Sequence, residues 1–160
     1  MYADQDYKII PIMEDGTDIG GGTETSSINM TNAHSVDIVV NFGDISVAGP
    51  RIQLTSAAAA NTDTTSIAKS VKISAADCGA ANADVFSVTV APTTDETYTQ
   101  PTHTQVDNRS LIMHVDASEL TPGHNWIRLT FGSQATGAAS AYAIVRPRYL
   151  PMGTMTAATA

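Results

Sequence analysis

Residues 125–151, NWIRLTFGSQATGAASAYAIVRPRYLP, hold the clearest pattern in the chain. Between residues 126 and 131 apolar and polar side chains alternate, and Ile127, Leu129 and Phe131 share one side. Successive side chains of a β-strand point to opposite faces. The alternation therefore predicts a strand with one face in a core and the other in solvent.

The second half of this stretch predicts a partner strand. Gly132 and Gly137 bracket a polar segment that suits the loop of a β-hairpin. The return strand covers residues 141–146, and Pro147 ends it because proline has no N–H to donate to a ladder. We therefore interpret residues 126–146 as two antiparallel strands paired across a short turn.

The same alternation recurs more weakly over residues 36–42, 51–55, 67–73, 85–91 and 111–115. The segment from Asp116 to Glu119 has capping-box spacing, which predicts one helical turn. About seven or eight short strands with almost no helix are typical of sandwiches and barrels. We predict an all-β fold, an antiparallel β-sandwich of jelly-roll or related type. Its core is expected to contain Val36, Ile38, Val40, Phe42, Leu54, Val88, Leu111, Met113, Ile127 and Leu129.

Residues 1–25 differ from the rest and predict an extended N-terminal arm. A short apolar segment, residues 7–13, precedes EDGTDIGGGTET, which holds four glycines and four carboxylates. The glycines favour a flexible linker, and the carboxylates lack the spacing of an EF-hand calcium loop, so a solvated acidic loop is predicted. The chain is thus expected to have an arm and linker (1–25), a β-sandwich domain (26–151) and a flexible tail (152–160).

The arm is expected to act as a strap between molecules, outside its own sandwich. Its apolar side chains are too many to be left in water, and an extended segment can add a strand to a sheet edge of another subunit or protein. The predicted protein interface comprises Tyr2, Tyr7, Ile9, Ile10, Ile12, Met13, Tyr149 and Leu150.

Composition argues against several classes of partner. The formal charge of −8 disfavours nucleic acid, whose phosphates need clustered Lys and Arg. The lysines are too few for a basic membrane-binding patch, and no apolar run has the length of a membrane span. The segment MYADQDYKII lacks the features of a signal peptide, so the protein is expected to be made in a cytoplasm. The single cysteine, Cys78, is expected to be a small semi-buried residue.

The sequence offers few residues for catalysis. No HxH, HxxxH or CxxC pair appears, and His114 and Asp116 are expected to make a structural contact on one strand face. Trp126, Tyr142 and Tyr149 offer a sugar-stacking platform, although Trp126 is more simply interpreted as packing under an edge of the sandwich. We predict no catalytic, cofactor-binding or metal-binding residue.

Five short motifs occur along the chain: SVDIVVNFG (35–43), RIQL (51–54), LIMHVDASEL (111–120), WIRLT (126–130) and RPRYLP (146–151). Together they resemble small structural proteins of tailed bacteriophages, which are encoded near the major capsid gene. The resemblance covers about residues 26–151 and implies a capsid decoration, or cement, protein with a β-sandwich fold. Such a protein is commonly a trimer on the head surface, so the implied partners are the major capsid protein and further copies of the chain.

Three hypotheses about function follow. The first is a non-enzymatic capsid decoration protein, on the surface of a virion assembled in the host bacterial cytoplasm. The second is another virion binding module, such as a tail or fibre component that contacts a host glycan. For this function Trp126 and the long polar segment 92–107 would matter most. The third is a glycoside hydrolase or other β-sandwich enzyme, for which no carboxylate pair stands out.

Overall fold

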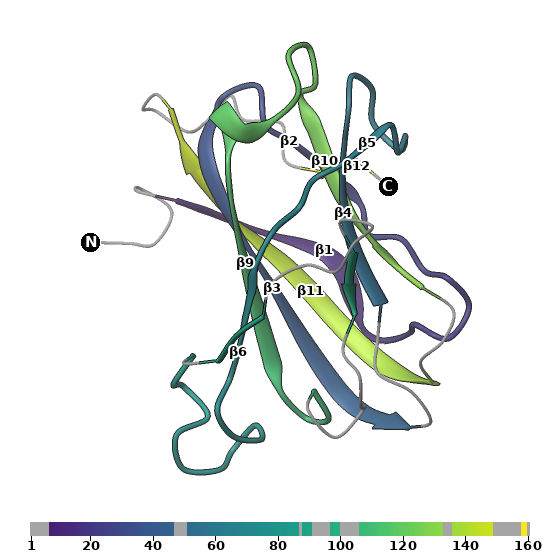
Figure 1. Ribbon diagram of the computed structural model, residues 1–160, viewed down its shortest axis with the longest axis vertical. Helices are drawn as coiled ribbons and strands as arrows, with labels where there is room; N and C mark the ends of the chain where they lie inside the picture. Colours follow the sequence, from purple (N-terminus) through teal and green to yellow (C-terminus); the bar gives the residue numbers. More distant parts are fainter. Residues whose placement is uncertain are drawn as a thin grey trace.

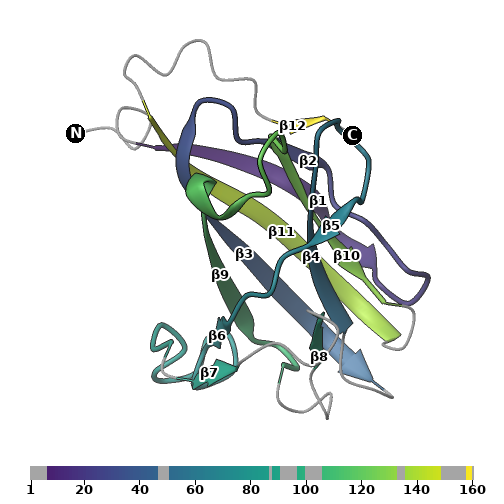
Figure 2. The same ribbon diagram turned by 45° about the horizontal axis from the view of Figure 1, so that its top comes forward.

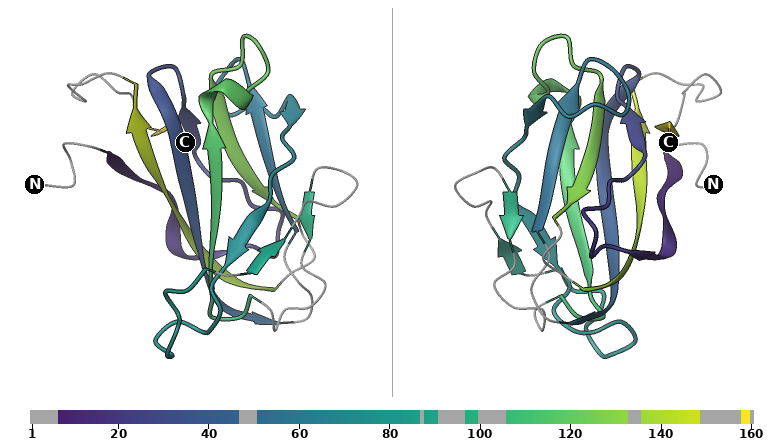
Figure 3. Two further views of the ribbon diagram at one scale, coloured as in Figure 1. Left: turned by 60° about the vertical axis from the view of Figure 1, so that its left-hand side comes forward. Right: turned by 90° about the vertical axis from the view of Figure 1, so that its right-hand side faces the viewer.

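The computed structural model describes residues 7–46, 51–86, 88–90, 97–99, 106–132, 136–148 and 158–159 (Figure 1). It is all-β, with two antiparallel sheets that enclose one hydrophobic core, consistent with a β-sandwich (Figure 3). The described part of the chain has no helix long and apolar enough to cross a membrane.

Sheet A has six strands, and its four longest run side by side in Figure 1. Their spatial order is β1 (Lys8–Asp18), β11 (Thr136–Pro147), β3 (Ala33–Ser46), β9 (Ser110–Asp116), β6 (Val71–Ile73) and β7 (Val88–Val90).

Sheet B forms the second layer (Figure 2). Its order is β12 (Ala158–Thr159), β2 (Ser27–Asn29), β10 (Trp126–Phe131), β4 (Arg51–Ala57) and β5 (Thr65–Ser66), and β8 (Thr97–Thr99) also pairs with β4. The predicted single helical turn is present as the 3₁₀-helix η2 (Ala117–Glu119). The Glu119 carboxylate accepts the Asp116 N–H at 2.8 Å, as a capping box requires.

The predicted hairpin of residues 126–146 is wrong, although both of its strands exist. Strand β10 pairs with β2 and β4 in sheet B, whereas β11 pairs with β1 and β3 in sheet A. Alternation specifies which face of a strand is buried but not which neighbour it pairs with. The apolar faces of the two strands therefore meet across the core instead of lying side by side.

The predicted core is confirmed for the side chains that the structure describes. Nine of the ten expected residues are buried, and the side chain of Val88 lies outside the description. The burial of Ile127, Leu129 and Phe131 shows that the period-two pattern identified the inward face of β10 correctly.

The N-terminal segment is a strand of the chain's own sheet, which corrects the prediction of a detached arm. From Lys8 to Asp18 it pairs with β11. The following glycine-rich segment is also anchored, because Ile19 is fully buried and the Ser26 N–H donates to the Ile12 carbonyl at 2.8 Å. The glycines suggested flexibility, but the buried Ile19 and the backbone hydrogen bonds hold this segment in one conformation against the sheet.

Other expectations concern the second half of the chain. Two residues of the predicted tail form β12 and pair with β2. Most of the long polar segment 92–107 lies outside the described residues, but Val106 is fully buried. Cys78 is exposed, whereas a semi-buried position was expected.

Candidate functional site

Arg128 is the centre of a charged cluster on the outward face of sheet B. It lies between the core residues Ile127 and Leu129, so its side chain points away from the core. Its Nε and Nη2 donate to the two carboxylate oxygens of Asp63, each at 2.6 Å, and Nη1 lies 2.8 Å from Glu24 Oε2. The Arg128 side chain is only 10% exposed, whereas Asp63 is 28% and Glu24 is 45% exposed, so solvent screens the pair with Asp63 less than the pair with Glu24.

Asp63 comes from the loop between β4 and β5, which folds over the outward face of the sheet. Its carboxylate also accepts a short hydrogen bond from the Thr55 hydroxyl on β4. The hydrogen bonds from Arg128 lower the pKa of Asp63 most strongly; burial opposes them, and the bond from Thr55 adds to the lowering. The same pairing raises the pKa of Arg128. The pair of Asp63 and Arg128 is therefore ionised at neutral pH, and it holds the loop on the sheet.

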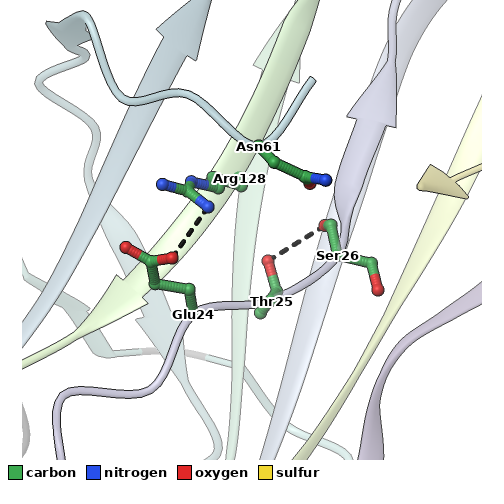
Figure 4. Close-up of a pocket in the computed structure, with 5 residues that line it drawn as sticks. All are labelled: Glu24, Thr25, Ser26, Asn61 and Arg128. Atoms are coloured by element: carbon green, nitrogen blue, oxygen red, sulfur yellow. Dashed lines mark hydrogen bonds and ion pairs between the residues drawn. The ribbon is translucent and has the colours of Figure 1, made fainter. Parts of the chain in front are cut away.

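A pocket of about 350 Å³ opens beside this cluster, lined by Glu24, Thr25, Ser26, Asn61 and Arg128 (Figure 4). Asn61 lies in the same loop as Asp63 and has a positive φ of 56°. Its N–H donates to the Ser27 hydroxyl at 2.8 Å, and that hydroxyl lies 3.2 Å from Asn61 Oδ1. The pocket is thus bounded by residues 24–26 and by the loop that carries Asn61 and Asp63. This loop is joined to Ser27 by hydrogen bonds and to Arg128 on β10 by the ion pair.

A second charged cluster lies on the outward face of sheet A. His114 Nδ1 is 2.5 Å from Asp37 Oδ1, and its Nε2 is 3.6 Å from Asp116 Oδ2. Arg146 Nη2 contacts the other Asp37 oxygen at 2.9 Å. The expected contact between His114 and Asp116 is present. The closer partner, Asp37, was missed because it comes from β3, which the register places opposite His114.

Beside these charges, an apolar surface crosses the outward face of sheet A. The register aligns Pro11 on β1 with Tyr142 on β11, then with Val39 on β3 and Ile112 on β9. One row away, Ile9 aligns with Ile144. We call these six residues the sheet A apolar row: Ile9, Pro11, Val39, Ile112, Tyr142 and Ile144. Val39 is only 5% exposed, so the other five make up the part that faces solvent.

The predicted interface residues divide into three groups. Ile10, Ile12 and Met13 are buried in the chain's own core, so the prediction that they contact a partner is wrong. Tyr7 is half-buried and Ile9 is 53% exposed, and for these two residues the prediction stays open. Tyr2, Tyr149 and Leu150 lie outside the described residues.

The proposed aromatic platform does not form from its described members. Trp126 lies on sheet B and Tyr142 on sheet A, and each alternates with core residues and faces outward from its own sheet. The sheets have opposite outward faces, so the two rings cannot stack on one ligand.

The sequence pattern did not reveal the cluster around Arg128. The only hint was an arginine between two core residues of an otherwise regular strand, and its partners Glu24 and Asp63 lie far away in the sequence. Among the described residues, no group of three or more His, Cys, Asp or Glu side chains is placed to hold a metal ion. Comparison with known proteins found no matching family model, no matching curated protein and no matching solved structure.

Proposed function

We propose that this chain is a non-enzymatic structural protein of a bacteriophage virion that binds the outer surface of the capsid and stabilises it. The observation that carries the proposal is the order of the strands, taken together with the phage-like motifs that lie on them. Motifs 35–43, 51–54, 111–120 and 126–130 fall on β3, β4, β9 with η2, and β10.

The strand pairing supports assignment to the jelly-roll type. Strand β1 pairs with β11, β2 with β10, β3 with β9, and β4 with β5. Successive pairs along the chain lie in alternate sheets, so β1, β11, β3 and β9 belong to one sheet and β2, β10, β4 and β5 to the other. Double-sheet jelly rolls are used in viral capsid proteins and in lectins, which favours a virion role.

The sheet A apolar row is the surface that suits contact with the major capsid protein. Ile9 is 53% exposed, and Tyr142 and Ile144 beside it are half-buried. Apolar residues gathered on an otherwise polar surface are typical of protein-binding sites. On sheet B, by contrast, the loop that carries Asp63 covers part of the outward face.

This surface is tested by adding purified protein to particles that lack it and measuring binding by cosedimentation. Ile9→Asp should weaken binding at least about tenfold, which corresponds to about 1.4 kcal/mol. The matched control is Val85→Asp, because Val85 is the other large apolar side chain described as exposed, at 43%. Equal binding by both variants would exclude the sheet A apolar row as the contact surface.

A second candidate is a tail or fibre component that contacts a host glycan, and the polar pocket beside Arg128 favours it. The two candidates differ in copy number, which quantitative mass spectrometry of purified particles measures. A decoration protein should be present in copy numbers comparable with the capsid protein. A tail or fibre component should be present in only a few copies per particle.

A further inference from the structure

The pocket beside Arg128 presents hydrogen-bond donors and acceptors in fixed positions. A guanidinium group has five N–H donors. Three of them are used by Asp63 and Glu24, which leaves two, and Arg128 is one of the residues that line the pocket. Glu24 uses Oε2 for the ion pair and keeps Oε1 as an acceptor, and its side chain is 45% exposed. The carboxamide of Asn61 lies across the pocket (Figure 4).

These groups are oriented before any ligand arrives. Asp63 holds the guanidinium by two parallel hydrogen bonds, and Thr55 holds Asp63 in turn. Asn61 is fixed through Ser27 on β2. A ligand therefore meets a rigid wall, and little side-chain entropy is lost when it binds.

The alternation of donors and acceptors defines the chemistry of the ligand. Adjacent hydroxyl groups each donate and accept, so a sugar diol can bond to Arg128 and Glu24 together. The two carboxylates and one guanidinium of the cluster sum to a charge of −1, and the chain as a whole carries −8. This field repels carboxylate, sulfate and phosphate groups. The volume of about 350 Å³ lies at the lower end of the range for small-molecule sites.

The polar groups of the pocket are its recognition surface, because Trp126, two residues before Arg128 on the same outward face of β10, does not line it. We propose that this pocket binds one neutral saccharide unit, through Arg128, Glu24 and Asn61. The inference names a ligand for the second candidate function, and it holds for the isolated protein whether or not the chain binds a capsid.

The test is an NMR titration of ¹⁵N-labelled full-length protein. The probes are the methyl glycosides of glucose, galactose and mannose, with glucuronate as the anionic counterpart. At least one neutral glycoside should produce saturable shifts in the side-chain N–H signals of Asn61 and Arg128, with a dissociation constant in the millimolar range. Glucuronate should bind at least about tenfold more weakly.

Two variants and a control complete the experiment. Asn61→Ala should weaken binding of the neutral glycoside at least about tenfold. Glu24→Gln should weaken it too, and should also reduce the discrimination against glucuronate because it removes a negative charge. Glu14→Gln, an exposed carboxylate on β1, should leave binding unchanged. Absence of saturable shifts up to about 50 mM of every neutral glycoside would overturn the proposal. So would tighter binding of glucuronate, or equal binding by all three variants. None of these results bears on capsid attachment, which is measured on particles.

Discussion

At the scale of single residues, Arg128 illustrates how an apolar strand positions a charged group. Its neighbours Ile127 and Leu129 are anchored in the core, so the guanidinium is forced outward, where the loop carrying Asp63 covers it. The alternation alone predicted the outward direction. The ion pairs depend on residues more than sixty positions away, which no local pattern encodes.

Asp63→Asn should lower the free energy of unfolding at neutral pH by about 1–3 kcal/mol, because charge-assisted hydrogen bonds to Arg128 are lost. Asp84→Asn changes an exposed carboxylate in a turn and serves as the control. Urea denaturation of both variants measures the difference. Equal stability would mean that the loop is held without the ion pair.

The same pair should make stability depend on pH. The pKa of Asp63 is lower in the folded protein than its ordinary value of 3.8, chiefly because of the hydrogen bonds from Arg128. The unfolded chain therefore takes up the proton first as the pH falls, so this contribution is complete well above pH 3.8 and is lost as the pH falls through the folded pKa. The stability gap between the parent and Asp63→Asn should be constant near neutral pH and should shrink on acidification below about pH 4. A gap that widened on acidification would contradict the assigned direction.

At the scale of elements, β1 separates what the sequence could predict from what it could not. The apolar residues of segment 7–13 were recognised as unfit for water. Their position in the chain's own sheet was not predicted, because the glycine-rich segment after them suggested a flexible linker. Pairing partners of strands depend on long-range contacts, and for the same reason the hairpin prediction failed while the buried faces of both strands were identified.

Two isoleucines of β1 test its place in the sheet. Ile12→Ala should cost about 2–5 kcal/mol, because Ile12 is 3% exposed and its loss leaves a cavity in the core. Ile9→Ala should change stability by less than about 0.5 kcal/mol, because its side chain is mostly in solvent. Thermal denaturation distinguishes the two. Equal and small effects of both substitutions would instead support the prediction that this segment is an arm outside the chain's own sheet.

The start of β11 depends on a glycine. At Gly137 φ is 153°, and an added Cβ would meet the Asp44 carbonyl oxygen and stand 2.7 Å from Ile45 Cδ1 on β3. Gly137→Ala should therefore destabilise the fold by about 1–3 kcal/mol through overpacking and backbone strain. At Gly21 a Cβ would meet nothing within 4 Å, so Gly21→Ala should be nearly neutral when the two melting temperatures are compared.

At the scale of the whole molecule, the sandwich class followed from the number and spacing of alternating segments. The distribution of the strands between the two sheets did not follow from the sequence, because it depends on pairing between strands that are distant in the chain. We expect the protein to assemble as a homotrimer, with a mass of three times 16.7 kDa, about 50 kDa. Multi-angle light scattering at tens of micromolar measures this mass, and a persistent monomer would argue against a preformed trimer.

A cryo-EM map of the virion that carries this protein tests the proposed capsid role most directly. The map should show the two-sheet fold at regular positions on the outer surface of the capsid, with the sheet A apolar row against the major capsid protein. Density for the chain only at the tail, only inside the head, or nowhere on the particle would contradict that role.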